Sequence, residues 1–115
     1  MKEEDIVYYD KIKSEENLVN LSNVFDFEWE KIFMVSNEEL YNIDFEKEFG
    51  FDCKVIPYEK EPFNVLILLN ENKCVHSFYY DYRYITFEMK ENIISKENSL
   101  LKLEKTAKKI ILRNI

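Results

Sequence analysis

The residues of this chain that could ligate a metal are two cysteines and one histidine. Cys74 and His76 are two positions apart and would point to the same face of a strand, while Cys53 lies 21 positions before Cys74. Structural zinc takes four ligands in closely spaced pairs, which this set does not provide. We therefore expect no metal centre, no cofactor, and two buried thiols in a reducing cytosol. A disulfide is geometrically possible, but no sequence feature supports it.

Nucleophilic catalysis and glycoside hydrolysis are the other reactions that the residue types allow. Ser77 adjoins His76, but neighbours along a strand face opposite ways, and no glycine-rich elbow is present. Carboxylate pairs such as Glu28 and Glu30 could serve a glycosidase. Because the chain has 23 acidic residues, such pairs are expected by chance. The sequence thus predicts that the protein is not an enzyme.

The charges of the chain are unevenly distributed. Residues 1–62 contain 17 acidic and seven basic residues, a net charge of −10, whereas residues 63–115 contain six and nine, a net charge of +3. A negative half repels nucleic acid and attracts basic partners. No segment has the pattern of a signal peptide or a membrane helix. We therefore expect a cytoplasmic protein without a membrane or nucleic-acid partner.

The segment SFYYDYRYITF, residues 77–87, is dominated by aromatic side chains. In an uninterrupted strand its tyrosines would lie on both faces. We expect the core to cover only one face, so some of the rings should be exposed. Exposed tyrosines are enriched at the hot spots of protein interfaces. Base stacking is the alternative use, which the net charge of −7 disfavours.

Periodicity in the first third of the chain predicts one helix and one strand. Ser14 is a candidate N-cap, and apolar residues follow it at helical spacing, which predicts a helix near 14–24. Residues 25–35 alternate between two faces and predict a strand. The first 24 residues would then form an N-terminal helical segment, and residues 25–113 a body that contains the sheet.

A second helix is predicted within residues 37–49. Ser36 and Glu39 fit a capping box at its start, and Gly50 fits its end. Residues 53–56 then predict a short strand. These elements belong to a single α+β domain over residues 1–115, with a mainly antiparallel sheet of about five to six strands and one or two packed helices.

The second half of the chain predicts mostly strands. Residues 63–70, FNVLILLN, are apolar on both faces and predict a central, covered strand, which a tight turn joins to the strand that begins at Lys73. Residues 84–89 predict a further strand. Residues 99–113 fit either a helix or two strands around a turn, and the pattern alone slightly favours the helix.

The order of FEWEKIFMV, LY, EKEFGF, NVLILLNENKCV and ISKENSLLKLE resembles a family of small uncharacterised bacterial proteins, many secreted or lipid-anchored. The resemblance covers residues 25–113, although Glu30 stands where the family has Asp, Leu40 where it has Pro, and the lipoprotein leader is missing. It implies an α+β fold with a β-rich C-terminus, favours a hairpin over 99–113, and implies no enzyme activity. The matching positions are Trp29, Lys31, Tyr41, Phe49, Gly50, Leu66, Leu68, Ser95, Asn98 and Leu103.

An acidic half combined with exposed tyrosines is typical of a protein that covers a cationic surface. The sequence predicts an immunity protein of the contact-dependent inhibition type, which binds a cognate toxin and catalyses no reaction. The expected partner is a basic nuclease domain, and the expected oligomeric state is a monomer or weak homodimer. The alternatives are a phage-encoded inhibitor that mimics nucleic acid and a structural or envelope-related binding protein. The predicted partner-binding residues are Glu28, Glu30, Glu38, Glu39, Asp44, Glu46, Tyr80, Tyr82, Arg83 and Tyr84.

Overall fold

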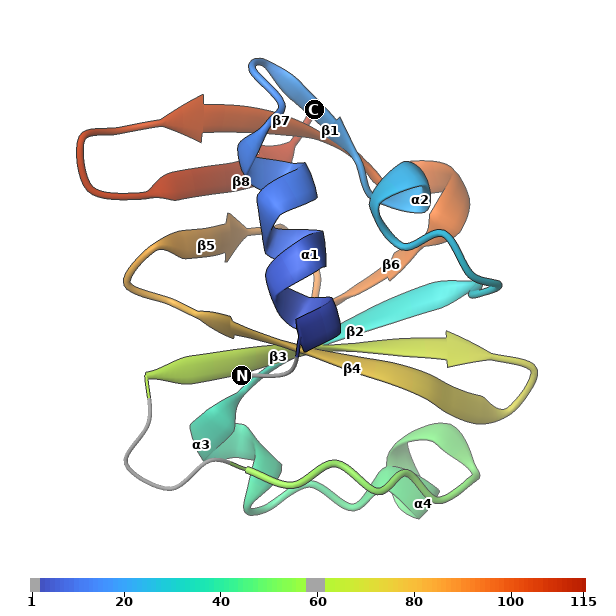
Figure 1. The fold of residues 1–115 in the computed structure, drawn as a ribbon. Coiled ribbons are helices and arrows are strands. Elements are labelled where there is room, and N and C mark those ends of the chain that lie inside the picture. The colour runs from blue at the N-terminus through green and yellow to red at the C-terminus, as the bar shows by residue number, and fades with distance from the viewer. Residues whose placement is uncertain (1–2, 58–61) are drawn as a thin grey trace.

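Two four-stranded sheets face each other and enclose the main core (Figure 1). The computed structural model describes residues 3–57 and 62–115. Sheet 1 has the strand order β1 (Leu18–Asn20), β7 (Leu100–Lys105), β8 (Ile110–Asn114), β5 (Ile85–Glu88). Sheet 2 has the order β4 (Lys73–Asp81), β3 (Phe63–Asn70), β2 (Lys31–Ser36), β6 (Ile93–Ser95). Paired strands are antiparallel, except that β5 and β8 are parallel.

Short helices surround the two sheets. They are α1 (Glu3–Lys13), α2 (Leu21–Val24), α3 (Asn37–Leu40), α4 (Phe45–Phe49) and the 3₁₀ helix η1 (Lys96–Asn98). Figure 1 shows α1 running across one open side of the two sheets, and α3 and α4 on the face of sheet 2 that is turned away from sheet 1. The predicted α+β fold with mainly antiparallel strands is confirmed, with eight strands in the described residues instead of five or six.

Sheet 2 is buried on both faces because its central strand is apolar on both. Leu66 and Leu68 of β3 point into the core shared with sheet 1, and Val65 and Ile67 point into a second core beneath α3 and α4. The prediction of a central, covered strand over 63–70 is confirmed. This three-layer arrangement decides which side chains of the neighbouring β4 can reach solvent.

The predicted hairpin between β3 and β4 is also present. Glu71 and Asn72 have φ values of 46° and 62°, the left-handed conformation that a two-residue hairpin turn requires at both positions. The C-terminal segment forms the hairpin of β7 and β8, which agrees with the family resemblance, and the alternative of a helix over 99–113 is wrong.

The predicted helix near 14–24 is wrong, because the helix lies earlier and ends at Lys13. Ser14 is not an N-cap; its hydroxyl donates to the Lys11 carbonyl at 2.8 Å and so closes the last turn. The first turn of α1 is acidic and its last turn is basic, which favours a helix over 3–13 through the helix dipole. Residues 18–20 pair with β7 as a strand instead.

The strand predicted over 25–35 begins only at Lys31. Phe25 and Trp29 anchor the preceding loop, where the Trp29 indole N–H donates to the Phe25 carbonyl at 3.1 Å. The residues from 52 to 57 have no regular structure, so the short strand predicted over 53–56 is wrong.

The helix predicted within 37–49 is interrupted and forms α3 and α4. The capping box of Ser36 and Glu39 is present at the start of α3. Asp44 caps α4 through its side chain, which accepts from the Lys47 amide at 3.2 Å. Gly50 ends α4 with a φ of 82°, as predicted.

The two cysteines form a disulfide, so the expectation of two free thiols is wrong. The Cα atoms of Cys53 and Cys74 are 5.7 Å apart. The loop after α4 turns back over the outer face of sheet 2, and this fold places Cys53 beside the start of β4. We call residues 36–57, which include α3 and α4, the outer layer. The disulfide therefore fastens the outer layer to sheet 2.

Candidate functional site

The turn between β4 and β5 presents three of the residues predicted to bind a partner. Tyr82 and Tyr84 are exposed by 47% and 51%, and Arg83 lies between them. The Tyr82 amide donates to the Pro62 carbonyl at 3.0 Å, and the Tyr84 carbonyl accepts from the Ile110 amide at 2.9 Å. We call Tyr82, Arg83 and Tyr84 the tyrosine corner. These two bonds hold the backbone of the corner on both sides, and the rings project from this hydrogen-bonded turn.

The charge of Arg83 is already paired within this corner. Its Nε and Nη2 atoms donate to the two carboxylate oxygens of Asp81 at 3.0 and 2.7 Å, and its guanidinium lies over the Tyr84 ring at 5.4 Å. The hydrogen bond from Arg83 lowers the pKa of the Asp81 carboxyl, and the same bond raises the pKa of Arg83. The corner therefore offers planar apolar surface more than free positive charge.

A groove of about 390 Å³ lies between α1 and the tyrosine corner. Its lining is mainly apolar, and Lys13 and Asp81 are the charged residues among those that line it. Burial raises the pKa of the Tyr9 hydroxyl, with smaller contributions from the charges of Asp10 and Asp81. The lining residues are Tyr9, Lys13, Phe78, Tyr79, Tyr80, Asp81 and Tyr84.

Tyr80, also predicted as an exposed contact, is only 6% exposed, so that expectation is wrong. Its ring belongs to the core between the sheets, while the next ring, Tyr79, belongs to the core on the other face. Burial raises the pKa of Tyr80 to about 12, against a hydrogen bond with Asn64 that lowers it. Sheet 2 is covered on both faces, so tyrosines on either face of β4 can be buried. The presence of tyrosine on both faces therefore does not imply that some of these rings are exposed.

The four predicted acidic residues of the outer layer are exposed. Glu38 and Glu39 lie on α3, Asp44 precedes α4, and Glu46 lies on it. Glu39 and Asp44 also cap these helices through their side chains. This layer reaches the same end of sheet 2 as the tyrosine corner, because the Asn64 side chain accepts from the Asn37 amide at 3.1 Å and is also bonded to Tyr80.

Glu28 and Glu30 lie at the opposite end of sheet 2. Lys31, the residue after Glu30, pairs with Leu69 beside the β3–β4 turn. At the other end of β2, Ser36 pairs with Asn64, which in turn pairs with Tyr80 of β4. The Glu30 carboxylate accepts from the Glu71 amide at 2.6 Å and thereby holds that turn. The predicted residues therefore form two groups, separated by the length of β2.

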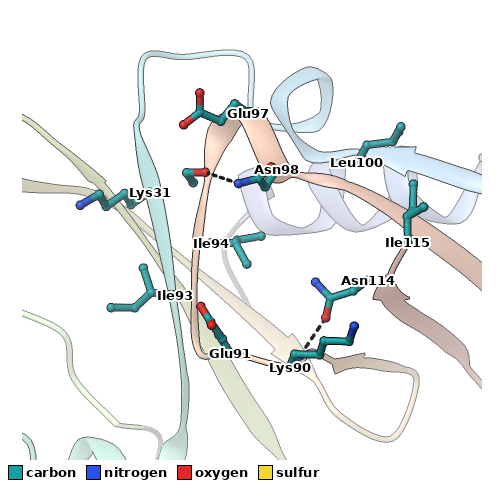
Figure 2. A pocket seen from close by; sticks show the side chains of 11 residues that line it. Lys31, Lys90, Glu91, Ile93, Ile94, Glu97, Asn98, Leu100, Asn114 and Ile115 are labelled. Carbon is teal, nitrogen blue, oxygen red and sulfur yellow. Dashed lines mark hydrogen bonds between the residues drawn. The ribbon is translucent and has the colours of Figure 1, made fainter.

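A second concave region lies along β6, where a cleft of about 660 Å³ separates this strand from the ends of sheet 1 (Figure 2). Figure 2 shows Ile94 pointing from β6 toward Asn114, with Leu100 and Ile115 beyond it. The side chain of Asn114 accepts from the Lys90 amide at 2.8 Å, and that of Asn98 donates to the Ser95 hydroxyl at 3.0 Å. No motif in the sequence pointed to this cleft.

The sequence interpretation also missed a polar contact beneath α1. Asp5 is fully buried, and its carboxylate lies 3.0 Å from Nε2 of His76 and accepts from the Tyr79 amide at 3.4 Å. Glu4 lies 3.9 Å from the other ring nitrogen of His76. Both ring nitrogens thus face carboxylates of α1. The His76 pattern gave no signal of this, because its partner lies 71 positions away.

The described residues contain no group of three His, Cys, Asp or Glu side chains placed to hold a metal ion. Cys53 and Cys74, two of the candidate zinc ligands, are joined to each other in a disulfide. Across residues 3–57 and 62–115, every helix is too short or too polar to cross a membrane. No protein-family model, curated protein or solved structure is significantly similar to the chain. The family resemblance therefore stays a prediction.

Proposed function

We propose that this chain is a non-enzymatic inhibitor of the immunity-protein type, which binds the basic nuclease domain of a toxin one to one. The observation that carries the proposal is the tyrosine corner with its adjoining groove. Tyrosine has few rotatable bonds and so loses little conformational entropy on binding, and exposed tyrosines beside an apolar depression are typical anchors of protein interfaces. The partner would insert an apolar side chain into the groove and rest on Tyr82 and Tyr84.

The outer layer supports a basic partner. Residues 36–57 contain six carboxylates and two lysines, a net charge of −4, whereas residues 96–115 contain six basic and two acidic residues, a net charge of +4. These segments lie on opposite sides of sheet 2 (Figure 1). A field with this polarity would turn the acidic layer toward a cationic surface and increase the association rate.

The groove favours this proposal over a mimic of nucleic acid. A mimic needs a continuous row of carboxylates, and the predicted carboxylates are divided between the outer layer and the β3–β4 turn, where Glu30 is occupied by the Glu71 amide. We accordingly include no nucleic acid and no membrane among the proposed partners, and we propose a monomer or weak homodimer.

The compartment is part of the same proposal. A toxin nuclease would be neutralised in the cytoplasm, where thiols are kept reduced, so the domain would have to stay folded without its disulfide. The bond between Cys53 and Cys74 favours an oxidising compartment instead. Alkylation of the thiols in freshly lysed cells distinguishes the two: modified Cys53 and Cys74 are expected, and a fully oxidised pair would contradict the cytoplasmic location.

The decisive experiment is a binding measurement with the C-terminal domain of a toxin encoded directly upstream of this gene. Titration calorimetry should give a one-to-one complex that abolishes nuclease activity. The double substitution Tyr82→Ala and Tyr84→Ala should weaken binding at least tenfold. Leu18→Ala is the control, because Leu18 is 48% exposed and lies on β1, at the end of sheet 1 opposite β5 and outside both the corner and the acidic segment 36–57. Equal losses for both variants, or no complex at all, would contradict the proposal.

A further inference from the structure

β6 is one of the two end strands of sheet 2, and within residues 3–57 and 62–115 no strand pairs with its outer edge. On the paired side, the Met34 amide donates to the Asn92 carbonyl at 2.7 Å, and the Lys96 amide donates to the Glu30 carbonyl at 2.8 Å. In an antiparallel ladder alternate residues direct both main-chain groups to the partner strand. The residues between them, Ile93 and Ser95, therefore direct theirs away from β2.

Three of these outward groups remain for a ligand. Ser95 is the N-cap of η1, so its carbonyl accepts the first bond of that helix. The N–H and C=O of Ile93 and the N–H of Ser95 are left, and among the described residues no strand pairs with this side of β6. Residues two apart in a strand repeat at about 6.6 Å, which matches the donor and acceptor spacing of an extended peptide.

The opposite edge of the same sheet is covered by α1 around His76 and Tyr79. There α1 packs against β4, and the buried Asp5 carboxylate accepts from the Tyr79 amide. Covering an edge in this way is how proteins prevent unwanted strand pairing. Along β6 the edge is bordered instead by the cleft of about 660 Å³ shown in Figure 2.

We propose that β6 binds an extended peptide segment of another protein by strand addition. Leu100, Asn114 and Ile115 line the side of the cleft opposite β6 (Figure 2). Leu100 and Ile115 are 44% and 70% exposed, so an apolar side chain of the peptide would cover them. In strand addition, main-chain bonds supply affinity, and such side-chain contacts supply specificity.

The basic and acidic side chains along the cleft are equal in number, so they favour neither a positively nor a negatively charged peptide. Lys31 and Lys90 are matched by Glu91 and Glu97. The peptide is therefore an uncharged or mixed segment with alternating apolar side chains. This site does not depend on the proposed toxin interaction, since the tyrosine corner follows β4 at the other edge of the sheet.

The test uses a displayed library of random eight-residue peptides, selected on the folded full-length chain. Peptides with alternating apolar residues should be recovered, and each should slow hydrogen exchange at the Ile93 and Ser95 amides. The matched reagent is the same synthetic peptide with N-methyl groups on the amides that would face β6, which should bind at least tenfold more weakly. This comparison leaves the protein unchanged, so it does not depend on whether a variant folds.

A protein variant provides the second readout. Ile93→Pro removes the outward N–H, an amide that is not bonded to β2, and should reduce peptide affinity at least tenfold. Ile93→Val keeps the N–H and should bind normally. Recovery of no peptide, protection of amides elsewhere only, or equal binding of the N-methylated peptide would overturn the proposal.

Discussion

The carboxylate of Asp5 and the imidazole of His76 meet at 3.0 Å beneath α1, although 71 positions separate them in the chain. Their contact joins the first turn of the N-terminal helix to the exposed half of β4. The rings of Tyr8 and Phe27 pack against the same imidazole in edge-to-face geometry, with their centroids 5.5 and 5.7 Å from that of His76. The pair thus determines where α1 closes the side of the two sheets.

Removing the Asp5 carboxylate should destabilise the fold. Asp5→Ala deprives His76 and the Tyr79 amide of a buried acceptor, so we expect the free energy of unfolding to fall by about 1–3 kcal/mol. Urea denaturation followed by circular dichroism measures this change. Asp10→Ala is the control, because Asp10 is an exposed carboxylate later in α1, and it should change stability by less than about 0.5 kcal/mol. Equal effects of the two substitutions would show that the buried contact adds nothing.

Breaking the disulfide should also destabilise the protein without unfolding it. Cys53 and Cys74 close a loop with a sequence separation of 21, for which the loss of loop entropy in the unfolded chain amounts to about 3 kcal/mol. Denaturation with and without dithiothreitol measures the difference. The double variant Cys53→Ser and Cys74→Ser should resemble the reduced protein and should not respond to dithiothreitol. A response in that variant would assign the effect to another cause.

Stability should decline at alkaline pH because Tyr80 is buried. Its pKa is about 12 in the fold and near 10 in the unfolded chain, so between these values the folded state binds more protons. The contribution is complete below pH 10 and is lost as the pH rises toward 12. At about 1.4 kcal/mol per pH unit, the difference of about two units corresponds to a loss on the order of 3 kcal/mol. Tyr80→Phe should decline less over this range, and an identical decline would contradict the assignment.

Gly50 should tolerate few side chains although space surrounds it. Its φ is 82°, and nothing lies within 4 Å of an added Cβ atom, so any cost of substitution arises from the backbone. Gly50→Ala should reduce the free energy of unfolding by about 1–2 kcal/mol. Gly50→Asn should cost less, because asparagine adopts the left-handed conformation more readily. Thermal or urea unfolding of the two variants provides the comparison.

The parts of the fold that were predictable depend on neighbouring residues. The capping box of Ser36 and Glu39, the helix end at Gly50 and the turn at Glu71 and Asn72 are all set by residues within a few positions. Their local geometry leaves a direct trace in residue type. The apolar run of 63–70 was equally informative, because only a strand covered on both faces can be apolar on both.

The errors arose where distant segments decide the structure. Residues 18–20 became a strand because β7 offers a partner, against their helical spacing. Tyr80 became buried because a third layer covers sheet 2, and no residue of β4 records how many layers surround it. The bond between Cys53 and Cys74 depends on the return of the loop after α4. Tyr82 and Tyr84 are exposed as expected. They lie in the turn between β4 and β5, where no second layer within the described residues covers the chain.

The pairing of β1 with β7 has a consequence for biosynthesis. Val19 lies opposite Leu101, so the amino-terminal strand has no partner until more than 80 further residues have left the ribosome. The β2, β3 and β4 strands, by contrast, are joined by much shorter stretches of chain and can pair earlier. We expect a nascent chain to acquire its inner hairpin first and to remain open on the other side until translation of the last two strands is complete.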